Sequence, residues 1–252
     1  MDMKTSPLAQ LNDPSLLKTD ALINGQWVKG GSRFAVTDPA TGQHLADVAN
    51  LGPAEAEQAI AAANAAWPAW KAKTAKERSI ILRKWYDLLM ANQDDLGRIM
   101  TAEQGKPLPE AKGEVAYGAS FVEWFAEEAK RVNGETLPQF DNNRRLLVLK
   151  QPIGVCAAIT PWNFPLAMIT RKVAPALAAG CPVVIKPAEQ TPLTALAAAE
   201  LALRAGIPAG VLNIITADGP QSIAIGQVLC ASDVVRHISF TGSTEVGRIL
   251  MA

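Results

Sequence analysis

Four short segments of the sequence combine polar side chains with glycine or proline in patterns that could bind or polarise a ligand. They span residues 160–165, 186–191, 216–221 and 241–244. Each follows a short apolar run and precedes a stretch with helical spacing, so we expect each to join a strand to a helix. In an open parallel sheet, ligands bind beyond the carboxyl ends of the strands. The four junctions are therefore the candidate functional site.

The first junction holds an asparagine between two prolines, in the order Pro161, Trp162, Asn163, Phe164 and Pro165. The prolines stiffen the loop. A side-chain amide held rigidly in this way can stabilise a developing oxyanion. The structural alternative is an asparagine that hydrogen-bonds its own backbone in a turn. The residues alone leave both interpretations open.

The second junction runs through Lys186, Pro187, Ala188 and Glu189. A lysine and a carboxylate three residues apart could bracket a ribose. The lysine would donate hydrogen bonds, whereas the carboxylate would accept them from the hydroxyls and repel a 2′-phosphate. The alternative is a solvated ion pair at the surface.

The fourth junction places Gly242, Ser243 and Thr244 after a predicted strand. Glycine allows close backbone approach, and free amides with a hydroxyl at a helix start suit a pyrophosphate. The alternative is an ordinary serine or threonine cap, and the usual dinucleotide fingerprint of three spaced glycines is absent. The third junction adds Gly219 to the candidate cofactor-binding residues.

The elements that would position these junctions alternate along the second half of the chain. Strands are expected at residues 155–160, 182–186, 212–216 and 237–241. Helices are expected at residues 165–179, 191–205 and 220–229, and from 243 onward. Continuous apolar strands between helices predict a parallel sheet covered on both faces. We therefore expect an α/β fold with a doubly wound, Rossmann-like parallel sheet.

The first half of the chain is predicted to contain hairpins and helices. Residues 1–20 are expected to form an irregular arm, and the Asn24–Gly25 pair predicts a hairpin at residues 21–28, followed by a second strand pair ending near Val48. Helices are expected at residues 54–70, 74–100 and 109–132. Thr74 and Glu77 match a capping box. The last of these helices carries an apolar stripe that is expected to pack in the core and consists of Phe121, Trp124 and Phe125.

A protruding antiparallel hairpin is predicted between the two halves. Residues 135–140 and 145–151 flank a turn, and the second run is apolar from Leu146 to Leu149. An apolar exposed ribbon would make sense as a contact with another chain or domain. The expected organisation is therefore an arm (1–20), N-terminal hairpins and helices (21–133), an oligomerisation-type hairpin (134–153) and a Rossmann-like core (154–252).

Composition excludes several classes of function. Lys and Arg total 24 and Asp and Glu total 24, so nothing favours nucleic acid or an anionic membrane as a partner. No apolar run approaches the roughly 18–20 residues of a membrane span, and no secretory signal is visible. The three cysteines show no pairing or metal spacing, and only two histidines are present. We expect a cytoplasmic protein without a metal site.

Taken together, the sequence resembles the aldehyde dehydrogenases along essentially its whole length. The matching segments are residues 159–165, 186–189 and 240–247, in that order. The ordered set is far more specific than any one motif. The resemblance implies oxidation of an aldehyde to an acid, in which a cysteine thiolate attacks the aldehyde, hydride passes to NAD or NADP, and water hydrolyses the thioester.

The resemblance also implies roles for individual residues. Asn163 would donate to the oxyanion, and Arg171 would bind the substrate. The cofactor would be held by Thr160, Pro161, Trp162, Lys186, Pro187, Ala188, Glu189, Gly219, Gly242, Ser243 and Val246. Glu189 favours NAD, with NADP as the alternative.

Three further segments are similar to one branch of the family, the succinate-semialdehyde dehydrogenases, of which the glutarate-semialdehyde dehydrogenases are near relatives. They are residues 101–107, 123–128 and 167–172. Substrates of this branch end in a carboxylate, which the Arg171 guanidinium could clamp. The alternative is an arginine that pairs with a local acid. The resemblance also implies a homodimer or homotetramer assembled through the hairpin.

One departure from the family is large. The family chain is about twice as long, and its nucleophilic cysteine and general-base glutamate belong to the half that is absent here. None of Cys156, Cys181 and Cys230 lies in the nucleophile motif, and Cys156 is inside an apolar strand, where a thiol is inert. We therefore expect this chain alone to lack dehydrogenase activity, with the catalytic domain missing. The alternatives are a non-catalytic nucleotide-binding or assembly fragment and a different Rossmann-type oxidoreductase.

Overall fold

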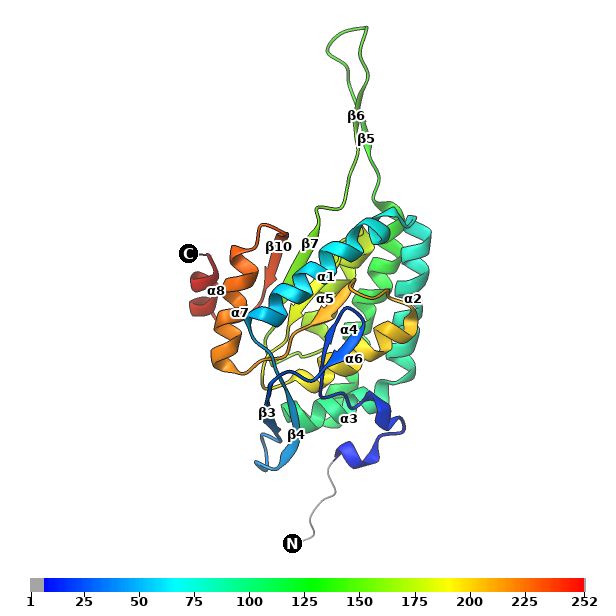
Figure 1. Cartoon of the computed structure of the whole chain (residues 1–252). Helices are drawn as coiled ribbons and strands as arrows, with labels where there is room; N and C mark the ends of the chain where they lie inside the picture. Colours follow the sequence, from blue (N-terminus) through cyan, green and yellow to red (C-terminus); the bar gives the residue numbers. More distant parts are fainter. Residues whose placement is uncertain (1–6, 252) are drawn as a thin grey trace.

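The computed structural model describes residues 7–251 and is built around a six-stranded sheet (Figure 1). The strand order is β10-β7-β8-β9-β1-β2. The parallel strands are β7 (Val155–Ile159), β8 (Val183–Lys186), β9 (Leu212–Ile214) and β10 (Val235–Phe240). The antiparallel strands at the other edge are β1 (Ala21–Ile23) and β2 (Gln26–Val28). The predicted α/β fold is confirmed, and the N-terminal hairpin extends its parallel sheet.

Helices cover both faces of the sheet, as the continuous apolar strands predicted. One face packs against α5 (Ala167–Ala179) and α6 (Pro192–Ala205), and the other against α1 (Pro53–Ala72) and α7 (Gly219–Ala231). Side chains alternate between the two cores along β7, where Cys156 and Ala158 face the first core and Val155 and Ala157 the second. This two-residue period is the ordinary consequence of strand geometry.

The order of the parallel strands creates a switch point between β7 and β10. The chain runs from β7 to β8 to β9 in one direction, and then returns so that β10 lies on the other side of β7. The helices on the two sides of this point lie on opposite faces of the sheet. Such a switch point opens a crevice at the carboxyl ends of the strands, where ligands of this fold class bind.

The N-terminal half adds a second hairpin and an outer helical layer. The strands are β3 (Ser32–Thr37) and β4 (His44–Asn50), and the helices are α2 (Ala75–Ala91), α3 (Gln93–Gln104) and α4 (Leu108–Glu128). Short 3₁₀ helices occur at η1 (Pro7–Gln10), η2 (Pro14–Leu16) and η3 (Ala129–Arg131). Residues 1–6 of the predicted arm lie outside the described residues.

Local capping signals were reliable in this half, but two predictions were wrong. Thr74 and Glu77 form the predicted capping box, with Glu77 N donating to Thr74 Oγ1 at 3.2 Å. The single long helix expected at residues 74–100 is divided at Asn92 into α2 and α3. The aromatic stripe of α4 is not all core, because Trp124 is 65% exposed while Phe125 packs against the core.

The predicted hairpin projects from the body as a two-stranded ribbon (Figure 1). It pairs β5 (Glu135–Leu137) with β6 (Leu146–Val148), so its regular part is shorter than expected. Leu147 and Leu149 are 69% and 76% exposed. No helix among the described residues is long and apolar enough to cross a membrane.

Candidate functional site

Strand register brings all four junctions to one edge of the sheet. Thr160 N donates to Lys186 O at 3.2 Å, and Thr241 N donates to Ile159 O at 3.1 Å. Ile215 N, just past β9, donates to Ile185 O at 2.8 Å. These bonds lie at or just beyond the last residues of the strands, so the loops that follow are neighbours around the switch point.

The first junction is held from outside by a lysine that the motif analysis did not identify. Lys106 Nζ donates to the Asn163 backbone carbonyl at 3.1 Å and lies 4.3 Å from the centre of the Phe164 ring. The Asn163 side-chain amide is exposed and makes no hydrogen bond within residues 7–251. The alternative of an asparagine satisfied by its own turn is therefore not realised.

The same lysine forms a buried ion pair with Glu114 of α4. Glu114 is 4% exposed, and its Oε1 accepts from Leu166 N at 3.0 Å and Ala167 N at 3.2 Å. This carboxylate occupies the N-terminus of α5, where free amides and the helix dipole favour negative charge. Lys106 and Glu114 thus fix both the asparagine loop and the helix after it.

Sequence patterns could not identify this pair. Lys106 precedes α4 and Glu114 lies within it, so the two residues do not share the i, i+4 spacing of a pair on one helix. Both also contact residues of the asparagine loop or just after it that are more than 50 positions away in the sequence. In the sequence, Lys106 stands out only as a member of residues 101–107, a segment that resembles the family.

The second junction contains a buried lysine rather than a solvated pair. Lys186 is 6% exposed, and its Nζ lies 3.3 Å from Glu189 Oε2. Burial lowers the pKa of Lys186 below its ordinary value. Glu189 is half-buried and also accepts from Gln190 Nε2 at 3.1 Å. Pro187 and Ala188 are buried, so mainly their backbone could face a ligand.

The helix after this junction also starts on a carboxylate from another helix. Glu103 of α3 accepts from Leu193 N and Thr194 N of α6, both at 2.7 Å. Burial raises the pKa of Glu103 to about 8, against the opposing effect of these hydrogen bonds. No local pattern pointed to Glu103, because its partners lie about 90 residues away.

At the third junction, Asp218 caps the N-terminus of α7. Asp218 Oδ1 accepts from Gln221 N at 3.0 Å, and Asp218 Oδ2 accepts from Asn50 Nδ2 at 2.8 Å. Gly219 is the first residue of α7 and is exposed, with open space where a side chain would be.

The fourth junction leads into α8 (Thr244–Met251), and its glycine is required by packing. A Cβ on Gly242 would lie 2.6 Å from Phe240 Cζ. Ser243 Oγ accepts from Val246 N at 3.3 Å, so the ordinary capping role considered for Ser243 is realised. Val246 is itself largely exposed.

The four helices that follow the parallel strands therefore begin in two different ways. Carboxylates from Glu114, Glu103 and Asp218 occupy the N-termini of α5, α6 and α7. At α8, no carboxylate of the described residues accepts from the first amides, and only a hydroxyl is present. The positive end of α8 is thus the one that remains open to an anion.

Arg171 lies on α5 without an acidic partner. Its guanidinium carbon is 5.5 Å from the centre of the Phe121 ring, its Nη1 is 3.9 Å from Met168 Sδ, and no carboxylate within the described part of the chain pairs with it. The alternative of an arginine neutralised by a local acid is not realised.

The neighbouring Lys172 points to the switch point and was not identified from the sequence. Its Nζ donates to Thr241 Oγ1 at 2.7 Å and to Ser239 Oγ at 3.1 Å, so it ties α5 to the end of β10. Burial lowers the pKa of Lys172. Arg171 and Lys172 are consecutive and line the same cavity, but only Lys172 hydrogen-bonds to residues at the end of β10.

Comparison with known proteins gives a consistent match. Residues 27–252 match the model of the aldehyde dehydrogenase family. The chain is 59% identical over 244 residues, covering 96% of the chain and 50% of the relative, to the succinate-semialdehyde dehydrogenase (NADP(+)) GabD of Escherichia coli strain K12. The same identity and coverage hold for a glutarate-semialdehyde dehydrogenase of Pseudomonas putida.

A solved structure shows the same fold. The crystal structure of succinate-semialdehyde dehydrogenase from Burkholderia pseudomallei is 60% identical with a TM-score of 0.93, covering 96% of this chain and 50% of that one. The chain spans about half the length of the curated relatives it matches.

Proposed function

The chain belongs to the aldehyde dehydrogenase family, and we propose that it is the NAD(P)-binding half of a dehydrogenase of semialdehyde acids. The complete protein would oxidise succinate semialdehyde, or a close semialdehyde acid, to the dicarboxylate. One observation carries the proposal: of the four helices that follow the parallel strands, only α8 presents an N-terminus to which no described residue brings a carboxylate.

The residues around α8 fit a cofactor pyrophosphate. The amides of Thr244 and Glu245 have no acceptor among the described residues, and Ser243 supplies a hydroxyl beside them. Val246 offers an exposed apolar surface one turn on. Lys186 and Glu189 would hold the adenine-side ribose, with Thr160, Pro161 and Trp162 along the channel. When bound, the nicotinamide would accept hydride from the aldehyde carbon.

Asn163 is the residue we propose as oxyanion donor. Its amide is exposed and uncommitted, and its backbone is fixed by Lys106. A donor held in place before the reaction costs no reorganisation when negative charge develops on the carbonyl oxygen.

Arg171 is proposed to bind the far carboxylate of the substrate, because its guanidinium has no acidic partner in the described part of the chain and its ring neighbour Phe121 leaves its donors available. In the full-length enzyme, Arg171→Leu should lower kcat/KM for semialdehyde acids at least about tenfold more than for neutral aldehydes of equal length. Equal losses for both classes would remove Arg171 from the substrate site.

The cofactor preference proposed is NAD over NADP. Glu189 and Asp218 both line a cavity of about 370 Å³ beside β3, so the region around the proposed ribose site is acidic. A 2′-phosphate would meet this charge, whereas a free hydroxyl could donate to it. A relative is named as an NADP enzyme, so the preference needs a direct test.

Calorimetric titration of the purified protein with NAD, NADP and adenosine tests the proposal. We expect NAD to bind more tightly than NADP and far more tightly than adenosine, which lacks the pyrophosphate. Adenosine binding as tightly as NAD would remove the pyrophosphate site at α8. Tighter binding of NADP than of NAD would overturn only the preference.

We further propose that this chain does not oxidise aldehydes by itself. Cys156 and Cys181 are buried. Cys230 is on α7, a different element from the asparagine loop and far from it in the sequence. NADH formation from succinate semialdehyde by the purified chain, abolished by a Cys-to-Ser variant, would contradict this.

The hairpin supports a second role in assembly. Leu147 and Leu149 are exposed on the ribbon whose outer edges carry unpaired backbone groups. We propose that the ribbon pairs with another copy of the chain to form a dimer or tetramer. Leu147→Lys should shift the sedimentation coefficient toward the monomer, whereas an unchanged value would place the contact elsewhere.

A further inference from the structure

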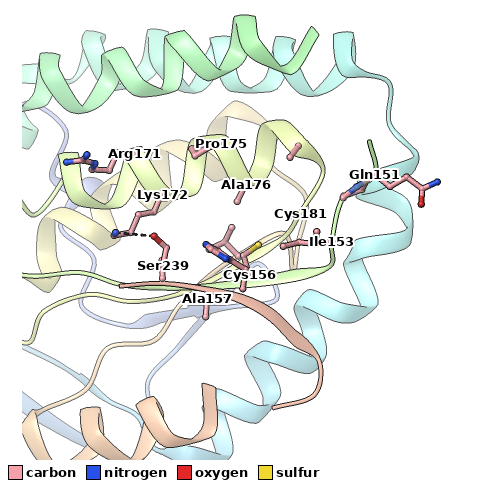
Figure 2. Close-up of a pocket in the computed structure, with 15 residues that line it drawn as sticks. Gln151, Ile153, Cys156, Ala157, Arg171, Lys172, Pro175, Ala176, Cys181 and Ser239 are labelled. Carbon is pink, nitrogen blue, oxygen red and sulfur yellow. Dashed lines mark hydrogen bonds between the residues drawn. The ribbon is translucent and has the colours of Figure 1, made fainter. Parts of the chain in front are cut away.

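Two cysteines that are far apart in sequence lie side by side in the fold. Cys156 is on β7, and Cys181 is in the segment that enters β8. Cys156 N donates to Pro182 O at 2.9 Å, and Cys156 and Cys181 line the same cavity of about 370 Å³ between α5, β7 and β10 (Figure 2). Their spacing in the sequence does not reveal this proximity, because it is the pairing of β7 with β8 that brings the two cysteines together.

The surroundings of Cys181 favour the thiolate. A hydrogen bond from the Cys156 thiol, backbone amides of Gly154 and Ile153, and the charge of Arg78 together lower the pKa of Cys181, against the opposing effect of burial. Hydrogen-bond donors and a nearby guanidinium are the usual means by which proteins activate a thiol.

The positive charge of Arg78 is one of the causes that lower the pKa of Cys181. Arg78 is buried in α2, and its Nε donates to Ala178 O at 3.0 Å. No carboxylate of the described residues forms an ion pair with it. A buried guanidinium without an anionic partner is costly, and the charges of Cys181 and Glu77 both favour its protonated form.

Both cysteines line a cavity that a small reagent could enter. Its lining includes the exposed residues Ile153, Arg171 and His237, so it reaches the surface. A volume of about 370 Å³ is ample for a molecule the size of hydrogen peroxide, since a water molecule occupies about 30 Å³ in the liquid.

We propose that Cys156 and Cys181 form a peroxide-sensitive dithiol, a modification site that closes to an intramolecular disulfide. The Cys181 thiolate attacks one oxygen of hydrogen peroxide, so that an S–O bond forms, the O–O bond breaks and hydroxide leaves to become water. Cys156 then attacks the sulfenic sulfur. The S–S bond forms, the S–O bond breaks, and the departing hydroxide takes the Cys156 proton. Two thiols are oxidised and one peroxide is reduced to two waters.

The order of the two steps follows from the coupling between the thiols. The hydrogen bond to Cys181, followed by burial, raises the pKa of Cys156, so Cys156 is not the first nucleophile. Conversion of Cys181 to a neutral sulfenic acid removes the charge that suppresses ionisation of Cys156. Cys156 then becomes the resolving thiol.

The test is oxidation of the purified chain with one equivalent of hydrogen peroxide near pH 7. Remaining thiols are blocked with N-ethylmaleimide in denaturant, and the products are mapped by mass spectrometry. We expect a tryptic cross-link between the peptides of Cys156 and Cys181, reversed by dithiothreitol. Its formation should be at least about tenfold faster than oxidation of the exposed Cys230.

Single variants separate the steps. Cys230→Ser is the matched control and should form the cross-link at the wild-type rate. Cys156→Ser should accumulate a Cys181 sulfenic acid that dimedone traps, because the resolving thiol is gone. Faster oxidation of Cys230 than of Cys181, or a cross-link that includes Cys230, would overturn the proposal. So would equal pairing yields in the native chain and in guanidinium chloride.

Discussion

The N-termini of α5 and α6 differ from that of α8, although all three helices follow parallel strands at one edge of the sheet. Glu114 and Glu103 reach in from α4 and α3 and accept backbone hydrogen bonds from the first turns of α5 and α6. Within residues 7–251, the start of α8 receives only the Ser243 hydroxyl as a side-chain acceptor. The first two helix ends are therefore already satisfied by the fold, and the third is available for a ligand.

The helices with satisfied and open N-termini also differ in how deeply they are buried. α6 is almost entirely buried, whereas α8 has no buried residue. Carboxyl oxygens in the first case act as internal acceptors that stabilise the core, where water cannot satisfy free amides. At α8 the amides can remain solvated until an external anion arrives. The same helix-end chemistry thus serves stability in one place and binding in the other.

The largest effect is expected from removal of the cation that balances Glu114. Lys106→Met leaves a carboxylate buried without its counter-ion, so the free energy of unfolding should fall by about 3 kcal/mol. Urea denaturation measures this. Lys112→Met is the matched control, because Lys112 also forms an ion pair, with Asp94 at 2.8 Å, but an exposed one. That variant should cost under about 0.5 kcal/mol. Equal losses in the two variants would show that the Lys106–Glu114 pair has no special structural role.

A slightly smaller effect is expected at Glu103. Glu103→Ala leaves two amides of α6 buried without acceptors, which should cost about 2–3 kcal/mol. Glu103→Gln retains an acceptor and resembles the protonated acid, so it should cost less than half as much. Thermal denaturation of both variants provides the measurement, and equal destabilisation by Ala and Gln would argue against the capping role.

Glu103 also predicts a dependence of stability on pH. Its folded pKa of about 8 lies above the ordinary value of 4.5 for a glutamate, so the folded protein binds the proton more tightly than the unfolded chain does. This contribution is fully present below about pH 4.5 and is lost as the pH rises through about 8. Wild-type protein should lose stability relative to Glu103→Gln over this range. A constant difference between the two would contradict the raised pKa.

The sequence predicted those parts of the molecule that depend on local chemistry. The Asn24–Gly25 turn and the Thr74–Glu77 capping box involve neighbouring residues, and both were found as expected. The alternation of apolar strands and helices predicted the sheet, since that pattern reflects burial on both faces. The junctions followed because strand ends can be located from the same pattern.

Features that depend on distant partners were not predictable in this way. Lys106 and Glu114 become meaningful only when α4 packs beside the asparagine loop. Trp124 lies on an apolar stripe, but its exposure depends on how α4 is rotated against α2 and α5. Cys156 and Cys181 lie close together only because β7 pairs with β8.

Glu189 is an acidic residue near the proposed cofactor site, and its charge can be tested separately from the N-terminus of α8. Glu189→Gln removes negative charge beside the proposed ribose site, so NADP affinity should rise roughly tenfold while NAD affinity changes little. Calorimetric titration with both cofactors separates the two effects. Unchanged affinity for NADP would show that Glu189 does not face the 2′ position.

The most direct test of the central claim is to fill the open helix end with a carboxylate. Ser243→Asp introduces an excellent cap and a negative charge, whereas Ser243→Asn introduces a cap of the same size without charge. NAD affinity of the two variants is measured by calorimetry, with thermal denaturation to confirm that both are folded. We expect Ser243→Asp to bind NAD at least about tenfold more weakly than Ser243→Asn. Equal affinity of the two variants would contradict the claim that α8 receives the cofactor phosphates.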